Sequence, residues 1–242
     1  MQKHFFTTRG HSAALSYAAM QLEQNGWQKS EDAPIVLLPV PSFDPGGNLK
    51  GGGCLNDLDK ECTVIGGNLT PQITKKHKHL DLLKHPLYLS ENALITAHCA
   101  ICIAMENLPI TLCNCPALVV GWGRIGKCLA RLLRLLGAEV TIAARSESDR
   151  ALTEALGYAV MDITDEASDL SKFRVIFNTV PAMVLPEDRA VCCREDCLKI
   201  DLASKPGIGG KDVIWARGLP NLDAPESSGM LIAKIIRKEF EE

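Results

Sequence analysis

Three glycines are the residues of this chain whose type and spacing point most directly to chemistry. They lie in the segment Gly121-Trp-Gly-Arg-Ile-Gly126. The spacing G-x-G-x-x-G is typical of a turn that binds the pyrophosphate of a dinucleotide. The first glycine permits a tight turn, the second lets the backbone approach the pyrophosphate, and the third lets a helix pack closely on the preceding strand. We therefore predict a dinucleotide site here; the alternative is a glycine turn with a purely structural role.

The residues around the glycines predict the strand, helix and second strand that such a site needs. Residues 117–120 form a short apolar run between Pro116 and Gly121, which suits a buried parallel strand. The helix after the glycines has one apolar and one basic face, and Gly137 ends it. Residues 139–143 form the second strand. A bound phosphate would then meet free backbone amides at the positive end of the helix.

The residues after the second strand indicate which dinucleotide is preferred. A site for NAD usually has an acidic side chain there, which binds the ribose 2′-hydroxyl. This chain has Arg145 followed by Ser146 instead. A guanidinium beside a hydroxyl suits a 2′-phosphate, so we predict NADP(H) as the cofactor. The alternative is that Arg145 is a solvated surface residue.

Length and composition limit the class of protein. The chain has 242 residues, of which 46% are hydrophobic, so it is long enough for two lobes with real cores. Its formal net charge of −3 gives no electrostatic reason to bind nucleic acid or an anionic membrane. No apolar run reaches the roughly 20 residues of a membrane helix, and the first residues do not resemble a signal peptide. We therefore expect a cytoplasmic protein.

Ten cysteines raise the question of a metal or redox site. The pair Cys99-x-x-Cys102 lies in residues 93–105, an apolar stretch that predicts a buried helix, where cysteine behaves as a small hydrophobic residue. Cys192, Cys193 and Cys197 have no recognisable ligand spacing. Because a cytoplasmic chain keeps its thiols reduced, we predict no metal and no disulfide.

The first lobe is predicted to end at about residue 112, where the pattern changes. Its expected elements are strands at residues 3–8, 35–40 and 62–66, helices at 12–25 and 71–84, and a buried helix from about residue 90. The basic cluster from Lys75 to His79 is interpreted as a solvated helix face. Residues 41–53 are rich in glycine and proline, which favours a loop; a flexible turn and a lid over a site are both compatible with it.

The second half continues a strand and connector pattern. Short apolar segments at residues 159–161, 174–178, 198–202 and 213–216 alternate with polar connectors long enough for helices. This alternation predicts a parallel sheet with right-handed crossovers, whose ligands bind at the carboxyl ends of the strands. A final helix at residues 227–240 is expected to begin after a cap made by Asp223 and Glu226.

These elements together predict an α/β protein: a Rossmann doubly wound parallel sheet, a smaller N-terminal α/β lobe, and a returning C-terminal helix. We expect residues 1–112 to form the first lobe with its connecting helix. Residues 113–222 would form the NADP-binding domain, and residues 223–242 a helix that packs back on the first lobe.

Five segments carry a family resemblance: 121–126, 143–145, 178–182, 200–207 (Ile-Asp-Leu-Ala-Ser-Lys-Pro-Gly) and 218–225, together with Gly229. With these motifs the chain resembles the family formed by the A subunit of dipicolinate synthase over residues 90–240. The segment Asp201-Leu-Ala-Ser-Lys-Pro-Gly207 is specific, because it is not a general Rossmann feature. Residues 37–41 and 64–68 echo the first lobe of the family, but residues 27–34 are too few for the strand and helix that the family has there, so the lobe is shortened.

The resemblance implies an oxidation of dihydrodipicolinate to dipicolinate, the calcium-chelating diacid of bacterial spores, with NADP accepting hydride. In that family the A subunit is the dehydrogenase, and it works with a flavoprotein-like second subunit; a homo-oligomer is also expected. Such a site must orient the ring and hold two carboxylates. Lys205 is then a candidate for binding a carboxylate or moving a proton, with Ser204 and Asn178 as donors; the alternative for Lys205 is an exposed loop lysine.

The cofactor contacts are expected from the glycine turn, the end of the second strand, and the loops after the fourth and fifth strands. These residues are Gly121, Gly123, Arg124, Ile125, Gly126, Arg145, Ser146, Thr179, Val180, Pro181, Asp201 and Ala203.

Three other functions are weighed against this one. A 2-hydroxyacid dehydrogenase would need a histidine late in the nucleotide domain, but all six histidines lie at or before His98. A cofactor domain of the S-adenosylhomocysteinase type would want an acidic residue in place of Arg145. A non-catalytic paralogue that binds NADP(H) as a partner or sensor stays open.

Overall fold

The structure is a computed structural model that describes residues 3–165 and 167–241. The chain forms two compact units. The first comprises the residues up to Ile95 together with those from Pro220 onward, and the second comprises Thr96–Leu219. The division between the units therefore falls within helix α3 (Pro86–Asn107). The domain limit expected at about residue 112 lies just beyond the end of this helix and stays a prediction.

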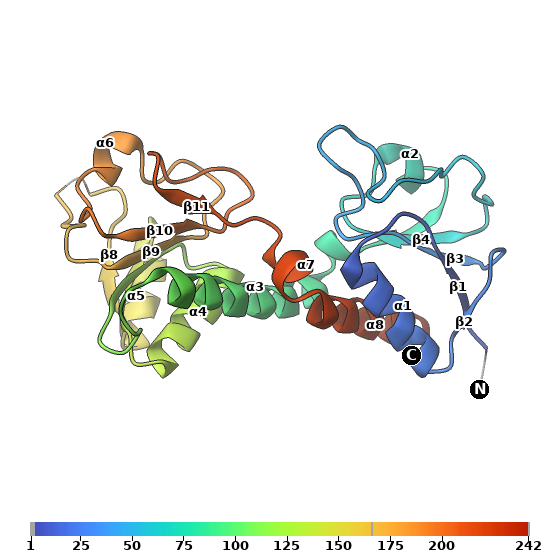
Figure 1. Ribbon diagram of the computed structural model, residues 1–242, viewed down its shortest axis with the longest axis horizontal. Helices are drawn as coiled ribbons and strands as arrows, with labels where there is room; N and C mark the ends of the chain where they lie inside the picture. Colours follow the sequence, from blue (N-terminus) through green and yellow to red (C-terminus); the bar gives the residue numbers. More distant parts are fainter. Residues whose placement is uncertain (1–2, 166, 242) are drawn as a thin grey trace. The chain divides into compact units, whose positions relative to one another are not determined.

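The first unit contains a sheet of five parallel strands in the order β2-β1-β3-β4-β5 (Figure 1). The strands are β1 (Phe5–Thr8), β2 (Gln28–Lys29), β3 (Ile35–Leu37), β4 (Thr63–Gly66) and β5 (Lys78–Asp81). Helix α1 (Ala13–Gln24) begins at Ser12, whose hydroxyl accepts a hydrogen bond from the Leu15 amide. The strand and helix expected first in the chain are thereby confirmed, and β3 is shorter than expected.

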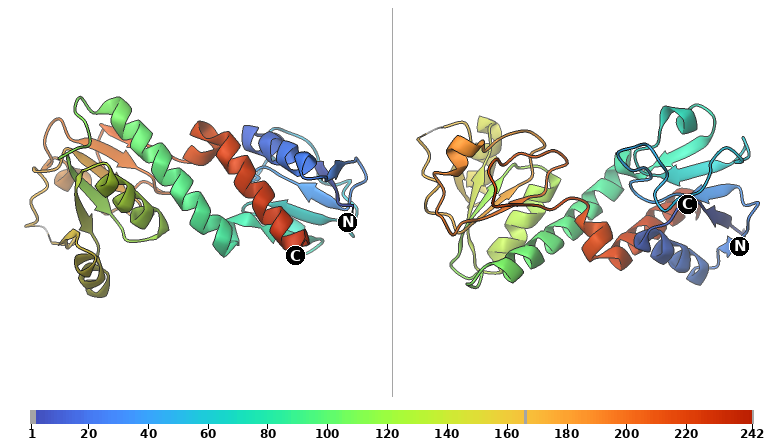
Figure 2. Two further views of the ribbon diagram at one scale, coloured as in Figure 1. Left: turned by 90° about the horizontal axis from the view of Figure 1, so that it is seen from below. Right: turned by 45° about the horizontal axis from the view of Figure 1, so that its top comes forward.

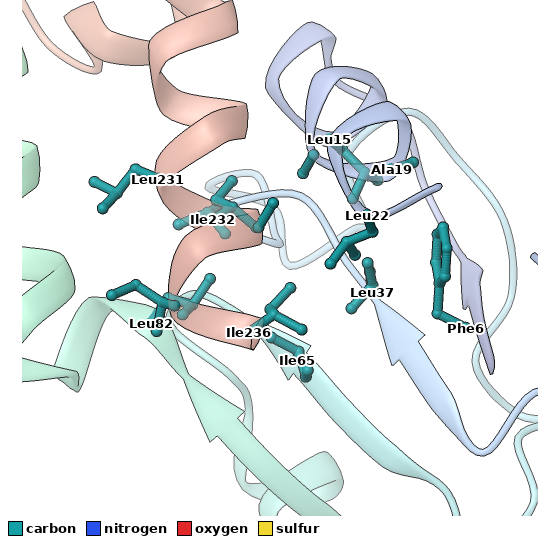
Figure 3. Packing of buried hydrophobic residues seen from close by; sticks show 14 of the residues in the cluster. Phe6, Leu15, Ala19, Leu22, Leu37, Ile65, Leu82, Leu231, Ile232 and Ile236 are labelled. Carbon is teal, nitrogen blue, oxygen red and sulfur yellow. The ribbon is translucent and has the colours of Figure 1, made fainter. Parts of the chain in front are cut away.

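The C-terminal helix α8 (Pro225–Glu241) packs beside α1 in this unit, as Figure 2 shows. Leu22 of α1 and Ile232 and Ile236 of α8 meet Phe6, Leu37 and Ile65 of the sheet in one apolar cluster (Figure 3). Burial of this face gives the first unit a core of its own.

Two expectations about this unit are wrong. Residues 71–84 are not one helix: α2 (Pro71–Thr74) is a single turn, and strand β5 and a 3₁₀ turn (Leu82–Lys84) follow. The Asp81 carboxylate at the end of β5 explains the change of direction, since it accepts the backbone amides of Asn68, Leu69 and Leu83. Helix α8 starts at Pro225, after the short helix α7 (Leu219–Asp223), so Asp223 ends one helix rather than capping the next.

The second unit contains six parallel strands in the order β11-β10-β9-β6-β7-β8. They are β6 (Pro116–Val120), β7 (Glu139–Ala143), β8 (Ala159–Met161), β9 (Val175–Asn178), β10 (Leu198–Asp201) and β11 (Val213–Trp215). The first strand in sequence, β6, lies between β7 and β9, so the chain winds in one direction and then in the other from the middle of the sheet. The predicted doubly wound α/β fold is confirmed.

The connectors of the second unit are only partly helical. Helices α4 (Arg124–Leu135) and α5 (Glu147–Ala155) follow β6 and β7 as expected. The later connectors differ from the prediction, because α6 (Glu187–Ala190) has one turn and β10 leads to β11 through irregular chain. Buried apolar side chains such as Phe173 and Leu185 cover the sheet there in place of helices.

Helix α3 is long and apolar enough to cross a membrane by length and composition alone, which the sequence analysis did not anticipate. The core helix of a soluble protein passes the same test, so this is weak evidence for a membrane span. Ala93, Ala97, Ala100 and Ala104 are buried within the protein, and they form one face of the helix.

Candidate functional site

The glycine turn joins β6 to α4, where the sheet changes its winding direction. Gly121 has a φ of +101°, and a Cβ there would lie 2.5 Å from the Thr179 hydroxyl oxygen. At Gly126 a Cβ would collide with the carbonyl oxygen of Gly121. The first and third glycines are therefore required for the turn and for the close approach of the helix, as the motif predicts.

The surroundings of Gly123 are less crowded than those of Gly121 and Gly126. Among residues 3–165 and 167–241, no atom outside its chain neighbours lies within 4 Å of a Cβ placed there, so the space beside it is open. Gly123 is also the N-cap of α4, and no side chain in the described part of the protein caps the helix. The amides of the first helical turn thus remain available to an anion at the positive end of the helix dipole.

Hydrogen bonds fix the strand ends around the turn. The Gly121 amide donates to the Ala143 carbonyl at 2.9 Å, which ties the turn to the end of β7. The Thr179 hydroxyl donates to the Val120 carbonyl at 2.9 Å, which ties the loop after β9 to the end of β6. Three strand ends are thereby held together at one edge of the sheet, the usual place for a ligand in such folds.

A cavity of about 610 Å³ opens at this edge, within the size range of small-molecule and cofactor sites. Five of the predicted cofactor residues line it, namely Gly121, Arg145, Ser146, Val180 and Pro181. The others do not: Gly123, Arg124 and Ile125 form the turn and the start of α4, and Gly126, Thr179, Asp201 and Ala203 lie in the supporting structure. The predicted cofactor residues therefore fall into two groups: those that line the cavity, and those that form the turn and the structure supporting it.

Arg145 is the exposed cation of the cavity. Its guanidinium makes no hydrogen bond or ion pair within the described part of the chain, while its carbonyl accepts a bond from Arg150 at 2.8 Å. Ser146 next to it caps α5, and its hydroxyl accepts the Asp149 amide at 3.3 Å. The backbone of Arg145 is held in place, and its charge is available to a ligand.

The charges around the cavity are mixed. Arg189 also lines it, and its guanidinium donates to the carbonyls of Ile163 and Asp165. Asp149 adds one negative charge. Just outside the cavity, hydrogen bonds from the side chain and backbone of Thr164 hold the pKa of Asp162 below its usual range, and the Arg150 guanidinium 2.8 Å away acts in the same direction.

Asn178 and Asp201 form a buried network at the ends of β9 and β10. The Asn178 amide nitrogen donates to Asp201 Oδ1 at 2.9 Å and to the Val180 carbonyl at 3.0 Å, while its oxygen accepts the Val180 amide. Asp201 also accepts the amides of Ala203, Gly207 and Ile208. Both side chains are almost completely buried, so the expectation that Asn178 donates to a substrate is not met in this structure. Its polar atoms are used to hold two loops.

Lys205 and Ser204 lie in the loop that this network anchors. Both are exposed, at the carboxyl end of β10. The loop is fixed on a second side by the Trp215 indole, which donates to the Ala203 carbonyl at 3.1 Å. The two predicted catalytic side chains thus project from a well-anchored loop into solvent.

Sequence reasoning missed several residues of the cavity. Asp149 lies in the first turn of α5, just after Arg145 and Ser146, and could have been found from the preference for acidic side chains at a helix start. Arg189 is distant in sequence from the glycine motif, and no local sequence pattern indicates that it lines the cavity. Trp122 lines the cavity from within the glycine motif, and its buried indole nitrogen has no hydrogen-bond partner among the residues described.

Metal chemistry finds no support among the residues that the structure describes: no group of three or more His, Cys, Asp or Glu side chains is placed to hold an ion. In the Cys-x-x-Cys pair of α3, Cys99 is buried and Cys102 is exposed. The two sulfurs therefore face different surroundings.

Known proteins resemble this chain in sequence and in fold. The A subunit of dipicolinate synthase from Bacillus subtilis (strain 168) is 27% identical over 199 residues, a segment that spans 76% of this chain and 66% of the relative, just under two thirds of its length. The crystal structure of the A subunit of dipicolinate synthase from Bacillus halodurans has a TM-score of 0.84 at 22% identity, covering 99% of this chain and 98% of that one. The Bacillus subtilis structure has a TM-score of 0.85 at 20% identity, covering 100% and 97%. No family model matches the chain.

The resemblance expected from the motifs is thereby confirmed. The fold also resembles that of an L-alanine dehydrogenase, which has a TM-score of 0.66 at 11% identity, covering 96% of this chain and 78% of that one. The chain is therefore similar to oxidoreductases in fold, and to dipicolinate synthase in sequence.

Proposed function

We propose that this protein is an NADP-dependent dehydrogenase that oxidises dihydrodipicolinate to dipicolinate. The observation that carries the proposal is the glycine turn, which combines an open space at Gly123, a helix start with exposed amides, and an adjacent cavity lined by the exposed Arg145. The sequence similarity to dipicolinate synthase supports the choice of substrate.

The residues of the turn fit a dinucleotide. The amides at the start of α4 would bind the pyrophosphate, and the open space at Gly123 allows its close approach. Arg145 would pair with the 2′-phosphate, with Arg189 as a second cation on the cavity wall. When bound, NADP would supply the hydride acceptor. The apolar walls given by Val180, Pro181 and Met183 would exclude water from one side of the site.

The loop after β10 is the proposed substrate contact of this unit. Lys205 would bind a carboxylate of the substrate by a charge-assisted hydrogen bond, and Ser204 would donate a second one. Asn178 and Asp201 would act as positioning residues, because their hydrogen bonds set the course of this loop and of the loop after β9. Loss of either network residue would displace the catalytic side chains without removing them.

Partners and location follow from the same proposal. We expect a flavoprotein-like second subunit to work with this chain, as the resemblance implies, and we expect the chain to form a homo-oligomer in the cytoplasm of a sporulating bacterium.

The competing function is a non-catalytic paralogue that binds NADP(H) as a partner or sensor. The two-residue strand β2, in the segment where the family has a strand and a helix, favours that alternative.

The test is an assay with dihydrodipicolinate and NADP⁺, with the second subunit present. We expect NADPH and an ultraviolet-absorbing pyridine dicarboxylate to form in equal amounts. Lys205→Ala should lower kcat/KM by about tenfold or more, the usual size of a lost charge-assisted contact. Lys211→Ala is the matched control, because Lys211 is an exposed lysine on the same connection, and it should retain full activity. NADP(H) binding without any product would contradict the catalytic proposal and favour the paralogue.

A further inference from the structure

Two cysteine side chains meet in the connection between α6 and β10. Cys193 packs against the apolar cluster that contains Cys197, and the two thiols are near enough to influence each other's ionisation, while Cys197 Sγ donates to the Leu198 carbonyl at 3.8 Å. Turns hold both residues in place, since the Cys193 amide donates to the Ala190 carbonyl at 3.3 Å and the Cys197 amide donates to the Arg194 carbonyl at 3.1 Å. Both side chains pack against the apolar core of the second unit. The contact is therefore part of the folded structure and not a meeting of two mobile loops.

The two sulfurs differ in exposure. Cys197 has 5% of its surface exposed, whereas Cys193 is half-buried and can be reached from solvent. A small reagent can therefore reach the Cys193 sulfur directly, whereas the Cys197 sulfur is shielded from solvent.

The charges around the pair favour a thiolate on Cys193. The interaction with the Cys197 thiol and the nearby Lys199 and Arg189 lower the pKa of Cys193 to about 7, although burial opposes them. The same interaction between the thiols, burial and the Asp196 carboxylate raise the pKa of Cys197. The accessible sulfur is thus the nucleophile, and the buried sulfur keeps its proton.

We propose that Cys193 and Cys197 form a peroxide-sensitive dithiol, in which Cys193 is the reacting cysteine and Cys197 is the resolving one. An accessible thiolate beside a second thiol is the arrangement found in cysteines that oxidise reversibly. The proposal concerns a modification site outside the candidate cofactor cavity and does not depend on the proposed dehydrogenase activity.

The chemistry balances with a hydroperoxide as the oxidant. The Cys193 sulfur attacks one peroxide oxygen, the O–O bond breaks, and the departing hydroxide takes a proton to become water. The resulting sulfenic acid is attacked by the Cys197 sulfur, the S–O bond breaks, and the second hydroxide leaves as water with the Cys197 proton. The two thiols together lose two electrons and two protons, and hydrogen peroxide is reduced to two waters.

The test is mass spectrometry of the full-length protein after brief treatment with hydrogen peroxide, followed by alkylation and digestion. We expect a disulfide between Cys193 and Cys197, formed before the exposed Cys54 and Cys113 are oxidised. Cys197→Ser should leave a sulfenic acid on Cys193 that dimedone traps, and Cys193→Ser should abolish the disulfide. The matched control is Cys192→Ser, which removes the exposed neighbouring thiol and should leave the disulfide unchanged.

Oxidation of Cys193 no faster than that of Cys54 would overturn the proposal, as would a disulfide from Cys193 to Cys192. If Cys197→Ser fails to fold by circular dichroism, the mapped disulfide of the unmutated protein decides the question alone. Dimedone labelling of the unmutated protein at Cys193, with no disulfide following, would equally refute a resolving role for Cys197.

Discussion

At the scale of single residues, the three glycines of the turn have separable roles. Gly126 is needed for packing, because a Cβ there would collide with the Gly121 carbonyl, whereas a Cβ at Gly123 would project into open space. Gly123 also has an ordinary φ of −78°. Stability should therefore depend on Gly126, and ligand approach on Gly123.

Alanine at each position tests this division. Gly126→Ala should lower the free energy of unfolding by about 1–3 kcal/mol, the usual cost of forcing an added atom into packed structure. Gly123→Ala should leave the unfolding transition almost unchanged but weaken NADPH binding, because its methyl group occupies the space beside the turn. Urea unfolding and a binding titration on both variants check the prediction. Equal stability loss in both would show that the turn does not distinguish them.

The buried Asn178 and Asp201 pair makes a second residue-level prediction. Asn178→Ala removes the donor to Asp201 and leaves the Val180 amide without its acceptor. A buried polar group left unpaired costs about 1–3 kcal/mol, so we expect a loss of that size in the free energy of unfolding. Asn107→Ala is the control, since that exposed asparagine donates to the Ile103 carbonyl of its own helix. A change in Asn178→Ala no larger than in the control would contradict the structural role.

The lowered pKa of Cys193 predicts how its rate of alkylation depends on pH. Its pKa of about 7 means that the reactive thiolate forms at a lower pH than in free cysteine, whose pKa is about 8.5. Alkylation of Cys193 by iodoacetamide should therefore rise with pH and reach half its maximal rate near pH 7, as peptide mass spectrometry would record. A profile that coincides with that of free cysteine would contradict the proposed influence of Cys197, Lys199 and Arg189.

At the scale of elements, the first unit depends on the close packing of α8 on α1. A Cβ at Gly229 of α8 would lie 2.7 Å from the Ala14 carbonyl and 2.8 Å from the Ala18 amide nitrogen. The two helices therefore approach backbone to backbone at this point, and no side chain fits between them.

Gly229→Ala should consequently destabilise the protein, even though alanine favours an isolated helix by about 1 kcal/mol over glycine. We expect a net loss of about 1–3 kcal/mol in the free energy of unfolding, because α8 must move away from α1. Ser227→Ala, on an exposed position of the same helix, is the control and should change stability by less than about 0.5 kcal/mol. A stabilised Gly229→Ala variant would show that the helices have room to separate.

Elements whose pattern is local could be predicted, and those set by distant contacts could not. Strand β6, the glycine turn, α4 and β7 follow from a continuous pattern of apolar residues and glycines. Strand β5 was missed because its pairing with β4 and the bonds to the Asp81 carboxylate come from residues more than ten positions away. Burial rises along β5 from exposed Lys78 and His79 to buried Asp81, so the strand lacks the alternation of polar and apolar residues that would reveal it.

At the scale of the whole molecule, two parallel sheets each have their own core, and the C-terminal residues belong to the first. The site could be predicted as far as its scaffold: the turn, Arg145 and the strand ends were all found from spacing. The burial of the Asn178 side chain could not be predicted from the sequence. For this reason Asn178 was interpreted as a ligand donor and not as the centre of a hydrogen-bond network. Arg189 escaped notice because only folding brings it to the cavity.

The measurement that tests the central claim most directly is a calorimetric titration of the protein with NADPH and with NADH, repeated on Arg145→Ala. We expect NADPH to bind more tightly, and Arg145→Ala to weaken NADPH binding by roughly tenfold to a hundredfold, the effect of losing a hydrogen bond to a charged group. NADH binding should be unchanged, and Arg131→Ala, which removes an exposed arginine of α4 outside the cavity, should behave as the unmutated protein. Equal, weak binding of both nucleotides that Arg145→Ala leaves unaltered would contradict the account.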